Sequence, residues 1–70
     1  MQVLVFKTNL MSAACIQQIA PILIEHPHIH RWNVDLQDCD NILRIETERL
    51  HGRAIEQIIG TAGFYCEELK

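Results

Sequence analysis

The sequence predicts a small α+β domain whose elements follow the order β-α-β-β-α-β. Two segments place apolar residues at helical spacing, and four short segments have the composition or the alternation of strands. The strands surround the helical segments in the pattern strand, helix, strand, strand, helix, strand. A length of 70 residues is typical of one domain, so we expect residues 1–70 to form a single folded unit.

The first part of the chain predicts a strand and then a helix. Gln2–Thr8 has the β-branched and aromatic content of a strand. From Ser12 the period changes, and Ser12 is a good N-cap because its hydroxyl can accept a bond from a free backbone N–H of the first turn. We expect Pro21 to kink this helix or shift its register, and the His-Pro-His segment 26–28 to end it. The apolar stripe of the helix consists of Ile16, Ile19, Ala20 and Leu23.

A hairpin follows the first helix. Trp32, Val34 and Leu36 alternate with polar residues, which predicts a half-buried strand. Residues 37–40 (Gln-Asp-Cys-Asp) indicate a turn, because aspartates readily bond their own backbone. Leu43 and Ile45 then predict the return strand.

The last part predicts a second helix and a final strand. The apolar stripe of this helix consists of Ala54, Ile55, Ile58, Ile59 and Ala62. Gly63 is well placed to end it in a left-handed conformation. We expect Phe64–Leu69 to form the last strand, with Cys66 on its inward side as a buried thiol of the core.

This element order is that of the split-βαβ, or ferredoxin-like, sandwich, in which two helices cover one face of a four-stranded antiparallel sheet. Right-handed crossovers bring the loop after the first strand, the hairpin turn and the loop before the last strand to one end. The residues expected to face the helices are Leu4, Phe6, Trp32, Val34, Leu43, Ile45 and Phe64. The uncovered face would carry Val3, Val5, Ile42 and Tyr65, which is enough apolar surface to suggest a partner or a second copy.

Composition excludes several classes of function. The net charge is −3, and the six basic residues are scattered, so neither a nucleic-acid surface nor a membrane-binding patch is expected. Lys7 and Asn9 interrupt the apolar start, which argues against a secretory signal, and no apolar run approaches the roughly 20 residues of a membrane helix. We therefore expect a cytoplasmic protein. Its three cysteines cannot form a full disulfide framework, and cytosolic cysteines are more often buried, reactive or metal-binding.

Three segments carry a resemblance to a known family: residues 6–15 (FKTNLMSAAC), 32–35 (WNVD) and 62–64 (AGF). They resemble the heavy-metal-associated domains of copper chaperones and metal-pumping ATPases, over nearly the whole chain. Stand-alone bacterial members, with a Thr-Asn-x-x-Cys-x-x-Cys segment and a proline in the first helix, are the most similar group. The resemblance implies that copper(I) or another soft ion binds between the two thiolates of Cys-x-x-Cys, in the loop after the first strand.

This chain departs from the family pattern at the metal-binding motif. Ser12 stands at the first cysteine position and only Cys15 remains, while the usual Met-x-Cys prefix is altered to Leu10-Met11-Ser12. Soft ions prefer thiolate or thioether ligands, and a serine hydroxyl is hard and rarely ionised. Cys15 would still lie at a helix N-terminus, where the dipole lowers the pKa of a thiol.

Three arrangements remain open from the sequence. Two chains could each give one Cys15 to a shared ion, or a further sulfur could come from Met11 or Cys39. In the third arrangement no metal is bound, and the scaffold is a metal-independent protein-interaction module. The resemblance favours a metallochaperone-like domain that uses Cys15 for a copper(I)-type ion, with another heavy-metal-associated domain or a second copy as its partner.

Other candidates have weaker patterns. His26, His28, His30 and His51 are expected at the end opposite Cys15, where we interpret them as parts of solvated loops rather than as a site for zinc, nickel or copper(II). Phe64 matches the aromatic that packs beside the metal loop in the family. No Ser/His/Asp set has motif context, and Cys15 would have no histidine near it as a base, so we expect no enzymatic activity.

Overall fold

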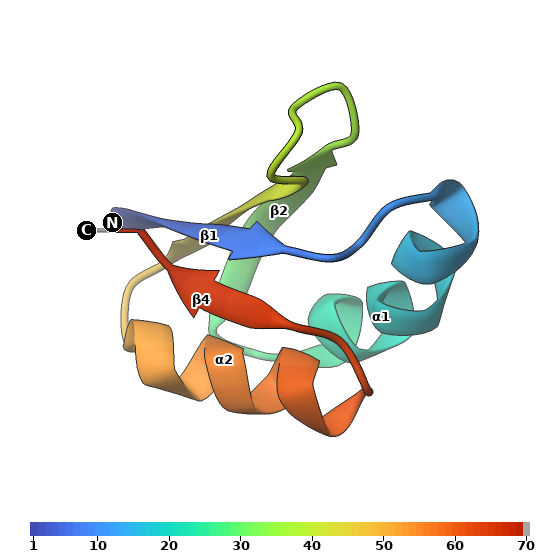
Figure 1. Cartoon of the computed structure of the whole chain (residues 1–70). Coiled ribbons are helices and arrows are strands. Elements are labelled where there is room, and N and C mark those ends of the chain that lie inside the picture. The colour runs from blue at the N-terminus through green and yellow to red at the C-terminus, as the bar shows by residue number, and fades with distance from the viewer. Residues whose placement is uncertain (70) are drawn as a thin grey trace.

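The computed structural model describes residues 1–69, and its elements follow the expected order. They are β1 (Gln2–Thr8), α1 (Ala13–Glu25), β2 (Ile29–Asp35), β3 (Ile42–Thr47), α2 (Gly52–Thr61) and β4 (Cys66–Glu68). The strands pair antiparallel in one sheet with the order β2-β3-β1-β4. Both helices lie on the same face of this sheet (Figure 1). The predicted ferredoxin-like βαββαβ fold is therefore confirmed.

The hydrophobic core lies between the sheet and the helices. Strand alternation turns Leu4 and Phe6 of β1 inward, where they pair with Ile45 and Leu43 of β3. Each fully buried aliphatic or aromatic side chain contributes about 1.5–3 kcal/mol. The other core residues with no exposed surface are Leu10, Ile19, Leu23, Ile55 and Ile59. The expected inward residues Trp32, Val34 and Phe64 are partly buried against this core.

Helix α1 begins where the sequence predicts. Ser12 has the extended conformation of an N-cap, and its hydroxyl accepts the backbone N–H of Cys15 at 3.4 Å. The helix continues through Pro21 to Glu25. The expected shift of register at Pro21 is wrong, because the core residues on either side of the proline, Ile19 and Leu23, are both fully buried.

Two strands have other bounds than the sequence predicts. β2 ends at Asp35, whose side chain accepts the N–H of Gln37 at 3.0 Å and starts the turn, so Leu36 lies outside the strand and is exposed. β4 spans only Cys66–Glu68 instead of Phe64–Leu69. Asn9 provides the reason, because its side chain accepts the N–H of Tyr65 at 2.8 Å and replaces the bond that strand pairing would supply.

Two buried threonines tie the loops together at the two ends of the sheet. At one end, the Thr8 hydroxyl donates to the carbonyl of Asn41 in the hairpin at 2.6 Å. At the other end, the Thr47 hydroxyl donates to the carbonyl of His28 between α1 and β2 at 2.6 Å. These bonds confirm the predicted distribution of loops between the two ends.

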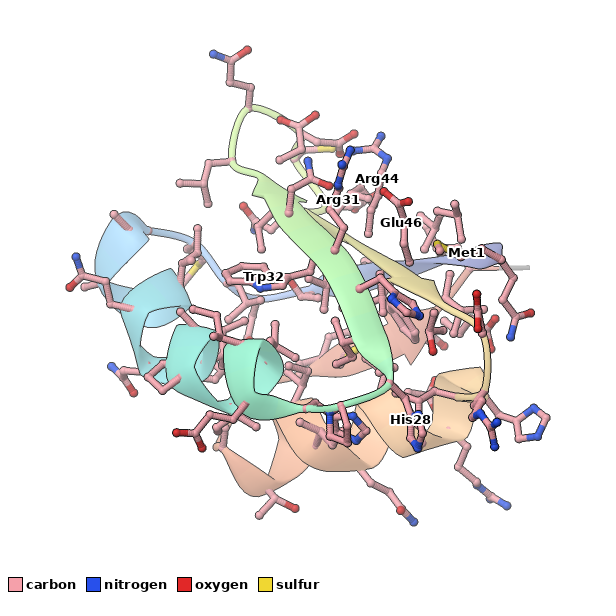
Figure 2. All side chains as sticks on the ribbon, turned by 180° about the vertical axis from the view of Figure 1, so that it is seen from behind. Met1, His28, Arg31, Trp32, Arg44 and Glu46 are labelled. Atoms are coloured by element: carbon pink, nitrogen blue, oxygen red, sulfur yellow. The ribbon has the colours of Figure 1, made fainter. Side chains whose placement is uncertain are left out.

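The uncovered face of the sheet carries charged residues beside its apolar ones. Figure 2 shows Arg31, Arg44 and Glu46 on the side of the sheet away from the helices, whereas Trp32 points toward them. Glu46 pairs with Val3 across the β1–β3 ladder and forms an ion pair with Arg31 at 3.9 Å. The expected open-face residues Val3 and Tyr65 are exposed, but Ile42 is only 7% exposed and adds little surface.

Candidate functional site

The loop between β1 and α1 is anchored on both sides. The Thr8 hydroxyl accepts the N–H of Leu10 at 3.1 Å, and the backbone N–H of Thr8 donates to the hairpin carbonyl of Asp40 at 3.0 Å. Asn9 bonds to both backbone groups of Tyr65, and Leu10 is fully buried. The sequence analysis did not identify Thr8 as a site residue. The sequence places Thr8 on the inward side of its strand, together with Leu4 and Phe6. A polar side chain is unusual in that position.

Ser12 and Cys15 face each other at the start of α1. The Ser12 hydroxyl lies 3.5 Å from the Sγ of Cys15 and donates to it. Cys15 is half-buried and packs against the core, while Ser12 is exposed. Ser12 therefore caps the helix as predicted and also provides a hydrogen bond to the sulfur of the one remaining cysteine of the motif.

This arrangement makes Cys15 a more acidic thiol than a free cysteine. The bond from the Ser12 hydroxyl is the main cause that lowers the pKa of Cys15, and backbone hydrogen bonds at Met11, Ser12 and Cys15 lower it further. Partial burial opposes the shift without reversing it. Because the thiolate is the form that binds soft metal ions and attacks electrophiles, this end of the molecule carries an activated sulfur.

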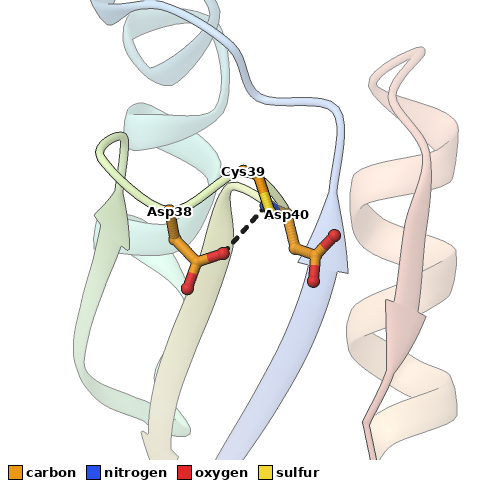
Figure 3. A group of neighbouring side chains, drawn as sticks. All are labelled: Asp38, Cys39 and Asp40. Atoms are coloured by element: carbon orange, nitrogen blue, oxygen red, sulfur yellow. Dashed lines mark hydrogen bonds between the residues drawn. The ribbon is translucent and has the colours of Figure 1, made fainter.

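Met11 and Cys39 were the expected sources of a further sulfur. Met11 is 70% exposed, one residue before the cap, so its thioether is accessible to a ligand or partner. Cys39 is exposed in the β2–β3 hairpin. Its sulfur and the carboxylates of Asp38 and Asp40 lie within 4.8 Å of one another, as Figure 3 shows. Within residues 1–69 this is the one cluster of three or more such groups, and Cys15 does not belong to it.

The hairpin cluster has a different chemistry from the Cys15 site. Asp38 accepts the N–H of Asp40 at 2.9 Å, and the amine of Lys7 lies 3.8 Å from the Asp40 carboxylate. Two hard carboxylates beside one thiol differ from the sulfur ligands that a soft ion such as copper(I) prefers. The cluster is consistent with an exposed turn that aspartates stabilise.

Cys66 behaves as the sequence predicts. It lies on the inward side of β4 and packs against the core beside Phe64. Burial, with a contribution from the Glu56 carboxylate, raises the pKa of Cys66 to about 12. This thiol stays protonated at neutral pH and packs as part of the core.

The histidines lie at the end opposite Cys15. The Thr47–His28 bond places the α1–β2 loop at that end, and Figure 2 shows His28 there. The ring of His26 lies 5.8 Å from that of His28, and its Nδ1 accepts the backbone N–H of His28 at 3.1 Å. The lone pair of the His26 Nδ1 is therefore already used by this bond. Within residues 1–69, no histidine belongs to a cluster of three or more groups that could hold a metal ion. The interpretation as loop residues holds for His28, whereas His26 and His51 cap the helices and His30 lies in β2, so for His30 it is wrong.

A groove of about 470 Å³ runs between the two helices. Three residues of the predicted α2 stripe, Ala54, Ile58 and Ala62, line this groove and are only partly buried. The lining residues are Ile22, Ala54, Gln57, Ile58, Thr61 and Ala62. None of the residues considered for metal binding lines the groove. Within residues 1–69 neither helix has the length and apolar character required to cross a membrane.

Comparisons with known proteins establish the fold. No protein-family model and no curated protein matches the chain. Among solved structures, a chain of the complex of Atx1, Cu(I) and the yeast domain Ccc2a aligns over 100% of this chain and 97% of its own, with 21% identity and a TM-score of 0.84.

Two further structures are similar over the same length. The copper-binding domain of HMA7, a P-type ATPase, matches at 22% identity and a TM-score of 0.83, with 100% of this chain and 96% of that chain covered. The N-terminal domain of PacS from Synechocystis matches at 17% identity and a TM-score of 0.81, with both chains fully covered. The chain has the fold of heavy-metal-associated domains, as its resemblance to that family predicts.

Proposed function

We propose that this chain is a metallochaperone-like domain that binds copper(I) or another soft ion through the Cys15 thiolate. The observation that carries the proposal is the activated Cys15 thiol at the N-terminus of α1, in an anchored loop. The fold supports it, because one similar domain, Ccc2a, has been solved in a Cu(I)-loaded state. The site is degenerate, with Ser12 at the first cysteine position of the motif.

The second sulfur ligand comes from outside the Ser12–Cys15 pair. The Ser12 hydroxyl is a hard ligand that already bonds to Cys15, so it stabilises the thiolate without replacing a sulfur. A second copy of the chain or another heavy-metal-associated domain would supply that sulfur, with Met11 as an accessory ligand. The complex of Atx1, Cu(I) and Ccc2a supports this arrangement, because it holds two proteins together with the ion. Three free cysteines fit the reducing cytoplasm.

Mapping backbone amide shifts by NMR tests where the ion binds. On addition of Cu(I) to the reduced protein, we expect the amides of Leu10, Met11 and Cys15 to shift. Cys39→Ser is the matched control, since it removes the other accessible thiol and should leave the shifts unchanged. Shifts confined to the hairpin at residues 38–40, and lost in Cys39→Ser, would contradict the proposal.

A second candidate function is a metal-independent interaction module on the same scaffold. The observation that favours it is the exposed apolar edge of the uncovered sheet face, where Met1 is 71%, Val3 57% and Leu69 43% exposed. Association that persists in Cys15→Ala and in excess chelator would support this candidate. We propose no enzymatic activity, since the histidines lie at the far end from Cys15.

A further inference from the structure

The two edges of the sheet differ in how their backbone groups are covered. β4 forms one edge, where the N–H of Glu68 donates to the Glu56 carboxylate of α2 at 2.8 Å. β2 forms the other edge and is longer, with 7 residues against 3. Within residues 1–69, the side-chain bonds nearest to β2 reach the carbonyl of His28 and the N–H of Gln37, which both lie outside the strand. The edge of β2 is therefore free to pair with a further strand.

The contacts of β1 fix which residues bond in which direction across the sheet. An interior strand of an antiparallel sheet bonds successive residues alternately to its two neighbours. The carbonyl of Val5 accepts the N–H of Leu69 at 2.8 Å. The N–H of Asn9 likewise donates to the carbonyl of Tyr65, so the odd-numbered residues of β1 bond toward β4. The N–H of Thr8 donates instead to the hairpin, which shows that the even-numbered residues bond toward β3.

The same alternation continues through β3 to β2. Even-numbered residues of β1 pair with odd-numbered residues of β3, as Leu4 does with Ile45. The even-numbered residues of β3 are left to bond toward β2, where they pair with the odd-numbered residues of the segment 31–35. Trp32 and Val34 therefore direct their backbone N–H and C=O groups to the open edge.

One register pairs the whole regular part of this edge with a second copy of the chain. β2 is irregular before Arg31, so the regular segment is 31–35. Antiparallel pairing centred on Asn33 sets Trp32 opposite Val34 of the second copy, and the reverse. The backbone groups that face the edge then bond to each other, two for each such pair. The side chains of Trp32 and Val34 are half-buried on the helix side and would meet those of the second copy there.

The charges on the uncovered face favour the same register. Arg31 would lie opposite Asp35 of the second copy at both ends of the paired segment, and directly opposite side chains share a face. The Arg31 side chain is 80% exposed on that face (Figure 2). It forms an ion pair with Glu46 at 3.9 Å and has other N–H groups to donate. A shift of two residues in either direction sets Asn33 opposite Arg31 or opposite Asp35, so both ion pairs are lost.

We propose that the β2 edge of this chain pairs antiparallel with the β2 edge of a second copy, in the register centred on Asn33, so that two four-stranded sheets join into one. This inference goes beyond the proposed function, because it requires neither Cys15 nor a metal ion. β2 runs toward the hairpin at the Cys15 end, so antiparallel pairing sets the two Cys15 sites at opposite ends. The contact is small beside the roughly 1,200 Å² of a stable interface, so we expect a Kd on the order of 1 mM and a monomer at micromolar concentrations.

The test is NMR spectroscopy of the reduced, metal-free chain from about 0.05 mM to about 2 mM. We expect the amide signals of Trp32 and Val34 to shift with concentration, while that of Glu68 at the covered edge stays in place. A mixture of isotope-labelled and unlabelled chains identifies the register. The two Asn33 residues form a pair without backbone bonds, so their Hα atoms should give an intermolecular contact. No concentration dependence, or intermolecular contacts only at other residues, would overturn the proposal.

Charge reversal tests the register independently. Arg31→Asp sets like charges opposite each other at both ends of the segment, as does Asp35→Lys. Each variant alone should therefore associate at least about tenfold more weakly than the parent chain. An equimolar mixture of the two variants pairs opposite charges again and should recover association to within about threefold of the parent. Arg44→Gln is the matched control, because it removes an arginine of the same face from the interior strand β3 and should leave association unchanged.

Two further variants separate the edge from the turn and from the metal site. Asp35→Asn can still accept the N–H of Gln37, as Asp35 does at 3.0 Å, so it keeps the turn and should weaken association about threefold through loss of the ion pairs. Cys15→Ala should associate like the parent chain without Cu(I), so the edge contact and the metal site are measured separately. No recovery in the mixture of Arg31→Asp and Asp35→Lys, or equal weakening in Arg44→Gln, would overturn the proposed register.

Discussion

The hydroxyl of Ser12 donates to the sulfur of Cys15 at 3.5 Å and accepts the backbone N–H of the same residue at 3.4 Å. One side chain therefore caps α1 and stabilises the thiolate at its N-terminus. By its resemblance to the family, the chain has a hydroxyl where a second thiolate would stand. Under the proposed function, this hydroxyl would stabilise the Cys15 ligand as a hydrogen-bond donor without supplying a second sulfur.

Ser12→Cys should restore a two-thiolate site. The scaffold and Cys15 are in place, and a second soft ligand would face the first across the start of α1. We expect affinity for Cu(I) to rise by about 100-fold or more, which corresponds to ~2.8 kcal/mol. Loss of the serine cap should cost about 1 kcal/mol of stability. Competition with a Cu(I) chelator measures the affinity, and Ser12→Ala is the control that removes the hydroxyl without adding a thiol. A folded Ser12→Cys chain that binds no better than the parent would mean that the site lies elsewhere.

Cys66 should make stability depend on alkaline pH. Its pKa is raised from an ordinary 9.0 to about 12, so the folded state holds this proton more tightly than the unfolded chain does. The resulting stabilisation is fully present below the ordinary pKa and is lost as the pH rises toward the folded value. Urea unfolding near pH 8 and near pH 10.5 should show a smaller decline for Cys66→Val than for the parent chain. Equal declines in both would contradict the buried, protonated state of this thiol.

Two glycines near the end of α2 should respond oppositely to alanine. Gly63 has φ of 100°, a left-handed conformation, so Gly63→Ala should cost about 1–2 kcal/mol. Gly60 lies within α2 with open space around the position of a Cβ, so Gly60→Ala should add about 0.5–1 kcal/mol. Chemical denaturation measures both. A neutral Gly63→Ala would mean that the chain leaves α2 by another route.

Self-association distinguishes the two candidate functions. With one thiolate per chain, we expect the reduced protein to be monomeric alone and dimeric with Cu(I), and Cys15→Ala to abolish the dimer. Val5→Glu should leave this dimer intact, because Arg44 and Glu46 already make the uncovered face polar. A dimer held together by the apolar residues of the uncovered face would persist in the presence of chelator and would dissociate in the Val5→Glu variant. Sedimentation velocity measures the oligomeric state of each variant with and without Cu(I). A monomer under all conditions would reject both the Cu(I)-bridged dimer and the dimer formed by the apolar face.

Local sequence rules predicted most of the fold. The strand Gln2–Thr8, the cap at Ser12 and the left-handed Gly63 were each predicted from residue types within a few positions, and the structure confirms all three. The end of β2 and the start of β4 could not be predicted in this way. Asp35 and Asn9 decide those boundaries by side-chain bonds, and the bond from Asn9 reaches Tyr65 at the other end of the chain.

The candidate site was predictable in part. The resemblance to the family identified Cys15 and Ser12 as site residues, and the change of period at Ser12 placed both at the start of a helix. The hydrogen bond from Thr8 that anchors the loop depends on the carbonyl of Asn41, 33 residues away, which a local pattern does not encode. The expectation that Cys39 might join Cys15 followed from topology, which assigns loops to an end of the sheet without giving distances between them.

The central claim is that Cys15 is the metal ligand, and a Cu(I) titration of the reduced chain against a competing chelator tests it most directly. Cys15→Ala should lose nearly all of the affinity, while Cys39→Ala, which removes the exposed hairpin thiol, should bind like the parent chain. Equal affinity in the parent and in Cys15→Ala would contradict the claim.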